Sequence, residues 1–153
     1  MRYTWGIFVF AWTLFVATAT PGAFWLDSSE LTAAGVTLGV PHPPAHPLYV
    51  LLSYAASLIP VGTVSFRVAL LSGLLSAAAA AVLYRLTLDV LAHVSTPRPS
   101  SLIALWTTLT FTVSEALWLQ STRAEVYSLH LLLVLVVTRW CVLVSMDSST
   151  RKS

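Results

Sequence analysis

Long apolar runs separated by short polar segments make up most of the chain. Crossing a bilayer as a helix takes about 20 apolar residues, and four runs are near that length or longer: residues 4–25, 66–92, 101–119 and 126–145. A fifth run, residues 48–59, covers only about 18 Å as a helix. It therefore predicts a re-entrant or interfacial helix, which Pro47 begins and Pro60 ends.

A second short helix is predicted between the first two long runs. Apolar residues recur at helical spacing after Asp27 and Glu30, and Gly39 can end this amphipathic helix. Asp27 followed three residues later by Glu30 is a capping-box arrangement, worth about 1 kcal/mol to the first turn. The alternative is that a carboxylate at the membrane surface acts as a general base, and Asp27 can do both.

Together these segments predict an all-α membrane protein with a single transmembrane domain over residues 1–153. About four helices cross the membrane, and two short helices lie in the loop of residues 26–65. Small residues at four-residue spacing in the second long run let helices approach closely and predict a packing surface; they are Ser72, Gly73, Ser76 and the alanines at 77–81.

Composition supports the membrane class. The chain is 57% hydrophobic and 9% charged, and its mean hydropathy is +0.81, which leaves too little polar surface for a soluble domain. The net charge of +2 includes no basic run suited to nucleic acid. Cys141 is the single cysteine, so the chain forms no internal disulfide and has too few ligands for a Cys/His zinc site.

The first run has two interpretations. Arg2, an apolar stretch and the small residues 17–19 resemble a secretory signal with its cleavage site. The apolar stretch continues to Leu26, longer than a signal core, and further spans follow it, so we prefer an uncleaved anchor.

The distribution of basic residues predicts an N-terminus on the cytoplasmic side. With four crossings, most basic residues then fall on that side: Arg2, Arg85, Arg98, Arg139, Arg151 and Lys152. Arg67 and Arg123 fall outside, and so does the loop of residues 26–65. Glu115, Arg123 and Glu125 lie in the connection between the third and fourth spans, which this orientation brings to the same extracytoplasmic face.

Ionisable groups in a membrane chain are costly and point to function. His42 and His46 lie in a proline-rich stretch, and each precedes a proline, which predicts an extended or polyproline backbone. The prolines between them exclude a helical zinc pair, and too few further ligands are near, so we expect no metal. The histidines either bond to backbone and lipid headgroups or contact a phosphate or sugar hydroxyl.

The two outer arginines also have two interpretations. Arg67 and Arg123 either extend their charged groups to the membrane surface or hold an anionic headgroup or leaving phosphate. Arg123 and Glu125, two residues apart, would point in different directions on a helix, so we expect each to have another partner. Tyr127 and His130 follow in the fourth run, where they could belong to the same site or equally form hydrogen bonds between helices. Walker-type loops, nucleophile-elbow serines and paired Cys motifs do not occur in the sequence.

Four ordered segments stand out along the chain: Asp27-Ser28-Ser29-Glu30-Leu31, Leu38-Gly39-Val40-Pro41-His42-Pro43-Pro44 with Pro47-Leu48-Tyr49, Phe66-Arg67-Val68, and Ala124-Glu125-Val126-Tyr127-Ser128-Leu129. Together they resemble a polytopic membrane family that includes the eukaryotic O-mannosyltransferase acting on plexin-type extracellular domains, a family similar to the GT-C glycosyltransferases. Members of the family continue through more spans, so the resemblance implies that this chain is the N-terminal part of a longer, GT-C-like helical bundle.

The resemblance implies transfer of a sugar, with mannose a candidate, from a polyprenyl- or dolichyl-phosphate donor to a protein or glycan hydroxyl on the extracytoplasmic side. Asp27 is then the expected general base and Glu30 the second catalytic candidate. The remaining candidates bind substrate, and an arginine or histidine among them supplies the cation for the leaving phosphate; they are His42, His46, Arg67, Arg123, Glu125 and Tyr127. No cofactor is expected, although divalent metal dependence is left open.

Two alternatives come from other classes. The first is a non-catalytic membrane subunit or degenerate paralogue that packs against another polytopic protein through the small residues of the second run. The second is a transporter fragment, suggested by the short run at residues 48–59 but weakened because the charges lie outside the bilayer midplane. The expected partners are membrane lipid and, for the enzyme, donor and acceptor; a partner supplying further helices is also compatible.

Overall fold

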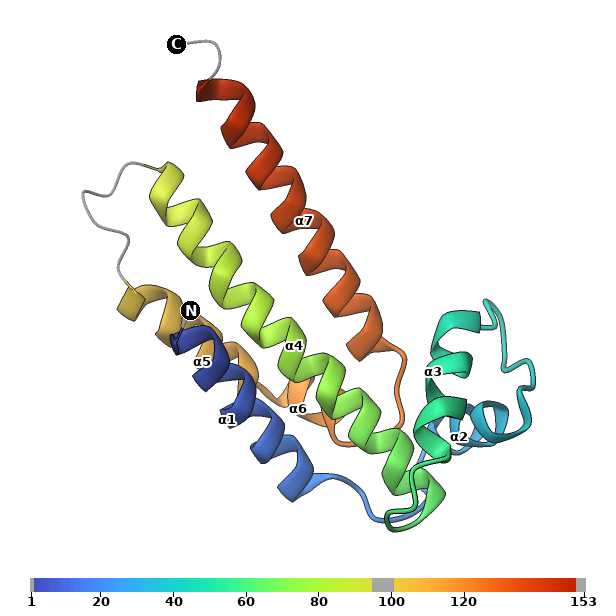
Figure 1. Ribbon diagram of the computed structural model, residues 1–153. Coiled ribbons are helices and arrows are strands. Elements are labelled where there is room, and N and C mark those ends of the chain that lie inside the picture. Colours follow the sequence, from blue (N-terminus) through green and yellow to red (C-terminus); the bar gives the residue numbers. More distant parts are fainter. Residues whose placement is uncertain (1, 95–100, 151–153) are drawn as a thin grey trace.

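The protein is an all-α membrane protein, and the computed structural model describes residues 2–94 and 101–150 (Figure 1). The described residues form seven helices: α1 (Arg2–Thr18), α2 (Ser28–Thr37), α3 (Pro47–Ser57), α4 (Val64–His93), α5 (Ser101–Thr112), α6 (Glu115–Ser121) and α7 (Tyr127–Thr150). The short helices α2 and α3 confirm the prediction for residues 26–65.

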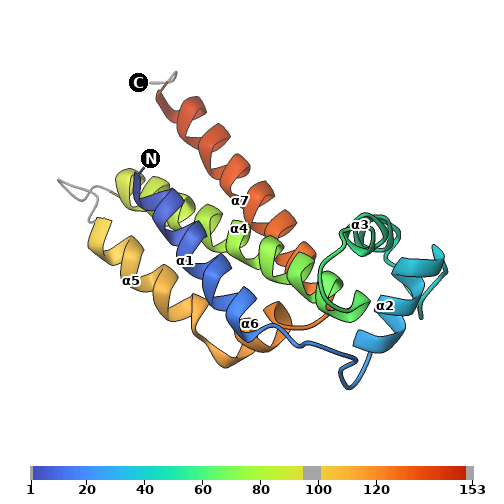
Figure 2. The same cartoon turned by 60° about the horizontal axis from the view of Figure 1, so that its bottom comes forward.

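Helix α4 is the centre of the fold. It packs against α1 and α7 and also contacts α5 and α6, while α2 and α3 gather near its first turns (Figures 1 and 2). Towards the other end, Arg139 of α7 donates from Nε to Asp89 Oδ2 of α4 at 2.7 Å. The long apolar runs thus form one bundle with the loop helices at one end.

The small residues of α4 allow this packing, as predicted. Ser72, Gly73 and Ser76 are buried, and a Cβ added to Gly73 would lie 3.1 Å from the Phe15 Cβ of α1. Ser76 donates to the Ser128 hydroxyl of α7 at 2.9 Å. This surface is therefore buried within the chain, which removes it as the docking surface of the non-catalytic alternative.

Helix lengths differ from the predicted spans. Within the described residues, α4 and the 127–147 part of α7 are long and apolar enough to cross a membrane, and the pair α5 and α6 adds a third span if the two are counted together. Residues 101–119, predicted as one span, do not form a single straight helix, because the chain bends by 62° between α5 and α6; their crossing of the membrane stays a prediction. Ser114 makes the break by accepting a bond from the Leu117 N–H as the N-cap of α6.

The first predicted span, residues 4–25, is helical only to Thr18. Pro21 cannot donate a helical hydrogen bond, and the Thr20 N–H instead donates to the Thr122 carbonyl at 2.7 Å. The number of crossings stays a prediction, as does the orientation. Three of the basic residues that support the orientation, Arg98, Arg151 and Lys152, lie outside the described residues.

Helices α2 and α3 pack at very close range. A Cβ on Gly35 would lie 2.6 Å from the Ser53 Cβ, so only glycine permits this approach. Leu31 of α2 and Tyr49 of α3 are buried in one cluster with Val68 of α4 and with Val126 and Leu129 around the start of α7. The loop helices are thus fixed to the membrane helices by an apolar core.

Candidate functional site

A polar contact between Glu30 and His42 joins α2 to the proline-rich segment. Glu30 Oε1 accepts the backbone N–H of His42 at 2.7 Å, and Glu30 Oε2 lies 2.9 Å from His42 Nδ1. Because an ionised carboxylate only accepts, Nδ1 carries a proton. The other ring nitrogen, Nε2, lies 4.0 Å from Asp27 Oδ2. His42 therefore lies between two carboxylates, both partly open to solvent.

The pKa values follow from this geometry. The hydrogen bonds from His42 lower the pKa of Glu30, and the hydrogen bond to Glu30 raises the pKa of His42. Burial opposes both shifts, and the charge of Asp27 adds to the rise at His42. The pair favours a carboxylate beside an imidazolium.

The capping-box interpretation is wrong for the side chains. Asp27 occupies the N-cap position of α2, but its backbone is helical (φ −71°, ψ −10°) and its carboxylate makes no capping hydrogen bond. The Glu30 carboxylate does not complete a capping box, because it is hydrogen-bonded to the backbone N–H and the ring of His42. Asp27 is exposed at the start of α2, where its carboxylate is open to solvent.

Arg123 and Glu125 form an ion pair, contrary to the prediction. Arg123 Nη2 lies 3.1 Å from Glu125 Oε1, and both side chains are almost fully buried. The prediction assumed a helix, whereas the chain between α6 and α7 is not helical and turns the two side chains together. Arg123 also bonds to Gln120 and packs over the Phe24 ring, 5.4 Å from its centroid.

This pair joins the two segments that were expected on one surface. Phe24 and Thr20 belong to the stretch leading to Asp27, and both contact the connection before α7. Burial raises the pKa of Glu125 and Arg123 lowers it; Asp27 raises it further and His42 lowers it. The Glu125 carboxylate therefore lies close enough to Asp27 and His42 to interact with their charges.

A buried hydroxyl pair supports the same connection. Ser72 of α4 accepts the Glu125 N–H at 3.1 Å and interacts with the Tyr49 hydroxyl at 3.1 Å. The sequence interpretation gave Ser72 only a packing role. Its position among small residues indicated close helix approach, but the backbone group that it bonds lies 53 residues further along the chain.

His46 has a different backbone from the predicted one. It is left-handed, with φ 42° and ψ 54°, and the preceding Ala45 also has a positive φ. The Ala45 N–H donates to the His42 carbonyl at 2.9 Å, and this turn outweighs the extended preference of a residue before proline. The His46 ring consequently meets His130 of α7, with 5.6 Å between ring centroids.

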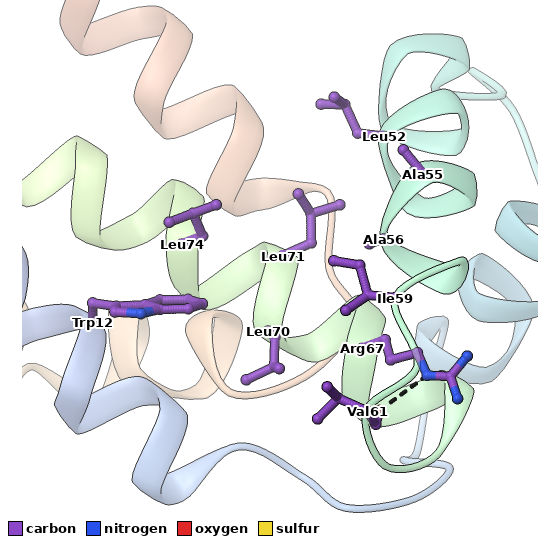
Figure 3. Close-up of a pocket in the computed structure, with 10 residues that line it drawn as sticks. All are labelled: Trp12, Leu52, Ala55, Ala56, Ile59, Val61, Arg67, Leu70, Leu71 and Leu74. Carbon is purple, nitrogen blue, oxygen red and sulfur yellow. Dashed lines mark hydrogen bonds between the residues drawn. The ribbon is translucent and has the colours of Figure 1, made fainter.

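Arg67 has a structural role in the described part of the chain. Its guanidinium donates to three backbone carbonyls that follow or end α3, those of Ser57, Val61 and Gly62, at 2.7, 2.9 and 3.0 Å. In Figure 3 it points towards this loop and away from the leucines of the adjoining cavity. The cavity measures about 370 Å³ and is lined mainly by apolar side chains of α1, α3 and α4.

Tyr127 is not brought to the carboxylates. It is the first residue of α7, is exposed, and lines a separate cavity of about 300 Å³ with Phe111 and Gln120. The described residues therefore bring together Asp27, Glu30 and His42, with Glu125 and His46 beside them, while Arg67 and Tyr127 contact other parts of the chain.

One group of side chains could hold a divalent cation. Asp27, Glu30 and His42 each offer one ligand atom, and these atoms lie within 4.8 Å of one another. Glu30 and His42 already satisfy one another by hydrogen bonding, so a cation would have to replace that contact. The expectation that no metal takes part stays a prediction.

Comparison with known proteins supports the resemblance. Residues 27–153 match the family model described as the protein O-mannosyl-transferase TMEM260 N-terminal domain. The chain is 38% identical over 123 residues to protein O-mannosyl-transferase TMEM260 of Mus musculus. That alignment covers 80% of this chain but only 16% of the mouse protein. No solved structure matches the chain.

Proposed function

This chain belongs to the family of TMEM260 N-terminal domains, and we propose that it is the N-terminal part of a GT-C-like glycosyltransferase. The reaction transfers a sugar, mannose by analogy with the named relative, from a polyprenyl or dolichyl phosphate to a protein or glycan hydroxyl. It takes place on the extracytoplasmic side. The observation that carries the proposal is the Asp27 carboxylate beside a histidine that Glu30 holds in place.

In the proposed reaction, Asp27 accepts the proton of the acceptor hydroxyl. The hydroxyl oxygen then forms a bond to the anomeric carbon of the sugar as the bond from that carbon to the phosphate oxygen breaks. The phosphate leaves with the bonding electrons, still attached to its lipid. Asp27 suits the role of base because its carboxylate is exposed and carries no capping hydrogen bond.

The leaving phosphate needs a positive charge nearby. Among the candidates, Arg67 is engaged with three carbonyls and Arg123 is buried against Glu125. His42 is exposed, and its hydrogen bond to Glu30 raises its pKa. We therefore assign the charge to the His42 imidazolium, Glu30 to positioning that ring, and Arg123 with Glu125 to holding the surface beneath it.

The remaining helices of a complete site come from outside these 153 residues. The aligned region is a small part of the mouse relative, and little of α7 is buried within this chain. Further helices of the same protein, or of a partner, would then complete the donor groove against α7.

The test is sugar transfer by the intact protein that contains this sequence. Asp27→Asn should lower the turnover from a lipid-phosphate sugar by at least about 100-fold, the lower range for loss of a general base. The protein should remain folded, because no cap is lost. Glu115→Gln is the matched control, since Glu115 is an exposed acid in the first turn of α6. Wild-type turnover in Asp27→Asn would refute the assignment.

A further inference from the structure

Three histidines form a row that leads away from the carboxylates. The His42 and His46 rings are 6.0 Å apart between centroids, and the His46 and His130 rings are 5.6 Å apart. His42 belongs to the proline-rich loop, His46 immediately precedes α3, and His130 lies in the first turn of α7. The row therefore connects the proposed reaction centre with a helix whose outer surface is apolar.

His46 reaches this row through an unfavourable backbone. Ala45 and His46 both have positive φ values, 69° and 42°, which costs a residue with a side chain roughly 1–2 kcal/mol. His46 also occupies the N-cap position of α3 without making a capping bond. Neither the His46 nor the His130 ring hydrogen-bonds to another residue in the described part of the chain. Their nitrogen atoms are open to a ligand.

The two rings border a cavity of about 270 Å³. Its other walls are apolar, with Pro44 and Leu48 on the side of α3 and Leu129 and Leu133 on the side of α7. Exposed apolar side chains continue the α7 wall at helical spacing: Leu133, Val136, Val137 and Trp140. The pocket thus has polar nitrogen atoms at one end and an apolar track leading from it.

We propose that this pocket binds the phosphate of the lipid donor, with the hydrocarbon chain lying along α7. The inference rests on the proposed function and names the donor subsite. A free sugar or free anion would leave the apolar track unused, and a hydrocarbon without a charged head would leave two imidazoles unpaired. A phosphodiester in the cavity that both rings line accepts hydrogen bonds from both.

Protonation of His46 depends on the ligand. Burial lowers the pKa of His46, and the neighbouring His130 and His42 lower it further. A bound phosphate offsets this repulsion, so binding takes up protons and strengthens as the pH falls from 8 to 6. The titratable groups around the pair are His42 in the loop, Tyr49 in α3 and, beyond His42, Asp27, Glu30 and Glu125.

The experiment measures equilibrium binding to the intact protein in detergent micelles. The probes are farnesyl methyl phosphate, a diester whose charge is constant over this pH range, farnesol, and dimethyl phosphate. His46→Asn, which tolerates the left-handed backbone, and His130→Gln should each weaken binding of the lipid diester about tenfold and leave farnesol binding unchanged. His93→Gln, a histidine at the far end of α4, is the control.

Several results would overturn the subsite. They are wild-type diester binding in both variants, equal loss of farnesol binding, dimethyl phosphate binding as tightly as the lipid diester, or no probe binding at all. If a variant fails to fold, the wild-type protein alone still tests the inference. Its affinity for the diester should rise as the pH falls from 8 to 6, and an affinity that stays constant contradicts the inference. If the wild-type protein has no transferase activity but the two histidine variants lose diester binding, the subsite is retained and the proposed function is rejected. If the variants bind the diester and transfer sugar as the wild type does, the proposed function is retained and the subsite is rejected.

Discussion

Arg123 and Glu125, two positions apart in the sequence, form a buried ion pair with 3.1 Å between Nη2 and Oε1. Their side chains are only 5% and 3% exposed. Arg123 Nε finds no hydrogen-bond partner within the described residues, so the guanidinium depends on Glu125, Gln120 and the Phe24 ring. The pair fixes the connection before α7 to the stretch that leads to Asp27.

Removing one member of this pair should be severely destabilising. Arg123→Met leaves the Glu125 carboxylate buried without a cation, which costs about 3–5 kcal/mol. Arg123→Met/Glu125→Met should be more stable than Arg123→Met alone, because no buried charge remains. The measurement is a double-mutant cycle, in which thermal unfolding is compared for the wild type, Arg123→Met, Glu125→Met and the double variant. Purely additive losses would show that the two charges do not depend on one another.

Local patterns were sufficient for α3, α4 and α7 but insufficient for the helix break before α6 and for the polar contacts. The apolar runs predicted α4 and α7, and Pro47 predicted the start of α3, because burial and proline geometry act over a few residues. The Arg123 and Glu125 contact depends on a break between α6 and α7 that no strong punctuating residue marks. The 62° bend before α6 likewise depends on Ser114, an ordinary residue that caps a helix here.

The proposed reaction centre was predicted only in part. Asp27, Glu30 and His42 were all selected from the sequence, but their mutual arrangement depends on a loop that returns over α2. Glu30 and His42 are 12 residues apart, and neither helical nor strand periodicity relates such positions. His46 was selected too, yet its left-handed backbone and its contact with His130 depend on tertiary structure.

The Glu30 and His42 pair predicts a pH-dependent loop. Glu30→Gln removes the carboxylate that raises the pKa of His42, so the titration midpoint of the His42 ring should fall towards its ordinary value of 6.5. NMR titration of histidine-labelled protein in micelles measures the midpoint. Ser29→Ala is the control, because the Ser29 hydroxyl bonds to the Phe24 carbonyl and not to His42. An unchanged midpoint in Glu30→Gln would contradict the observed contact.

The same pair sets the pH range in which the loop is best ordered. The raised pKa of His42 stabilises the folded state below pH 6.5, and this contribution is lost as the pH rises through the folded-state value. The lowered pKa of Glu30 stabilises it above pH 4.5, and this contribution is lost as the pH falls through the folded-state value. Both stabilising contributions are fully present between pH 4.5 and pH 6.5, so the protease resistance of the loop should be greatest in that range. Equal protection at pH 8.5 would oppose the prediction.

Gly35 should tolerate no side chain. An alanine Cβ would lie 2.6 Å from the Ser53 Cβ, so Gly35→Ala must separate α2 from α3 at a cost of about 1–3 kcal/mol. Gly6→Ala in α1 is the control, because nothing lies within 4 Å of the added Cβ. Melting temperatures in detergent compare the two variants. A melting temperature of Gly35→Ala equal to that of the wild type would mean that the helices separate without loss.

Topology can be tested with single cysteines. Helix α4 has 30 residues and is about 45 Å long, so a transmembrane α4 places its two ends on opposite sides of the membrane. Cys141 is exposed and is first replaced by serine. A cysteine at Ser29, in the loop region near the start of α4, should then react with an impermeant maleimide from the extracytoplasmic side. A cysteine at Val94, exposed at the end of α4, should react only after permeabilisation. Labelling of Ser29→Cys from the cytoplasmic side alone would place Asp27 where the proposed extracytoplasmic reaction cannot occur.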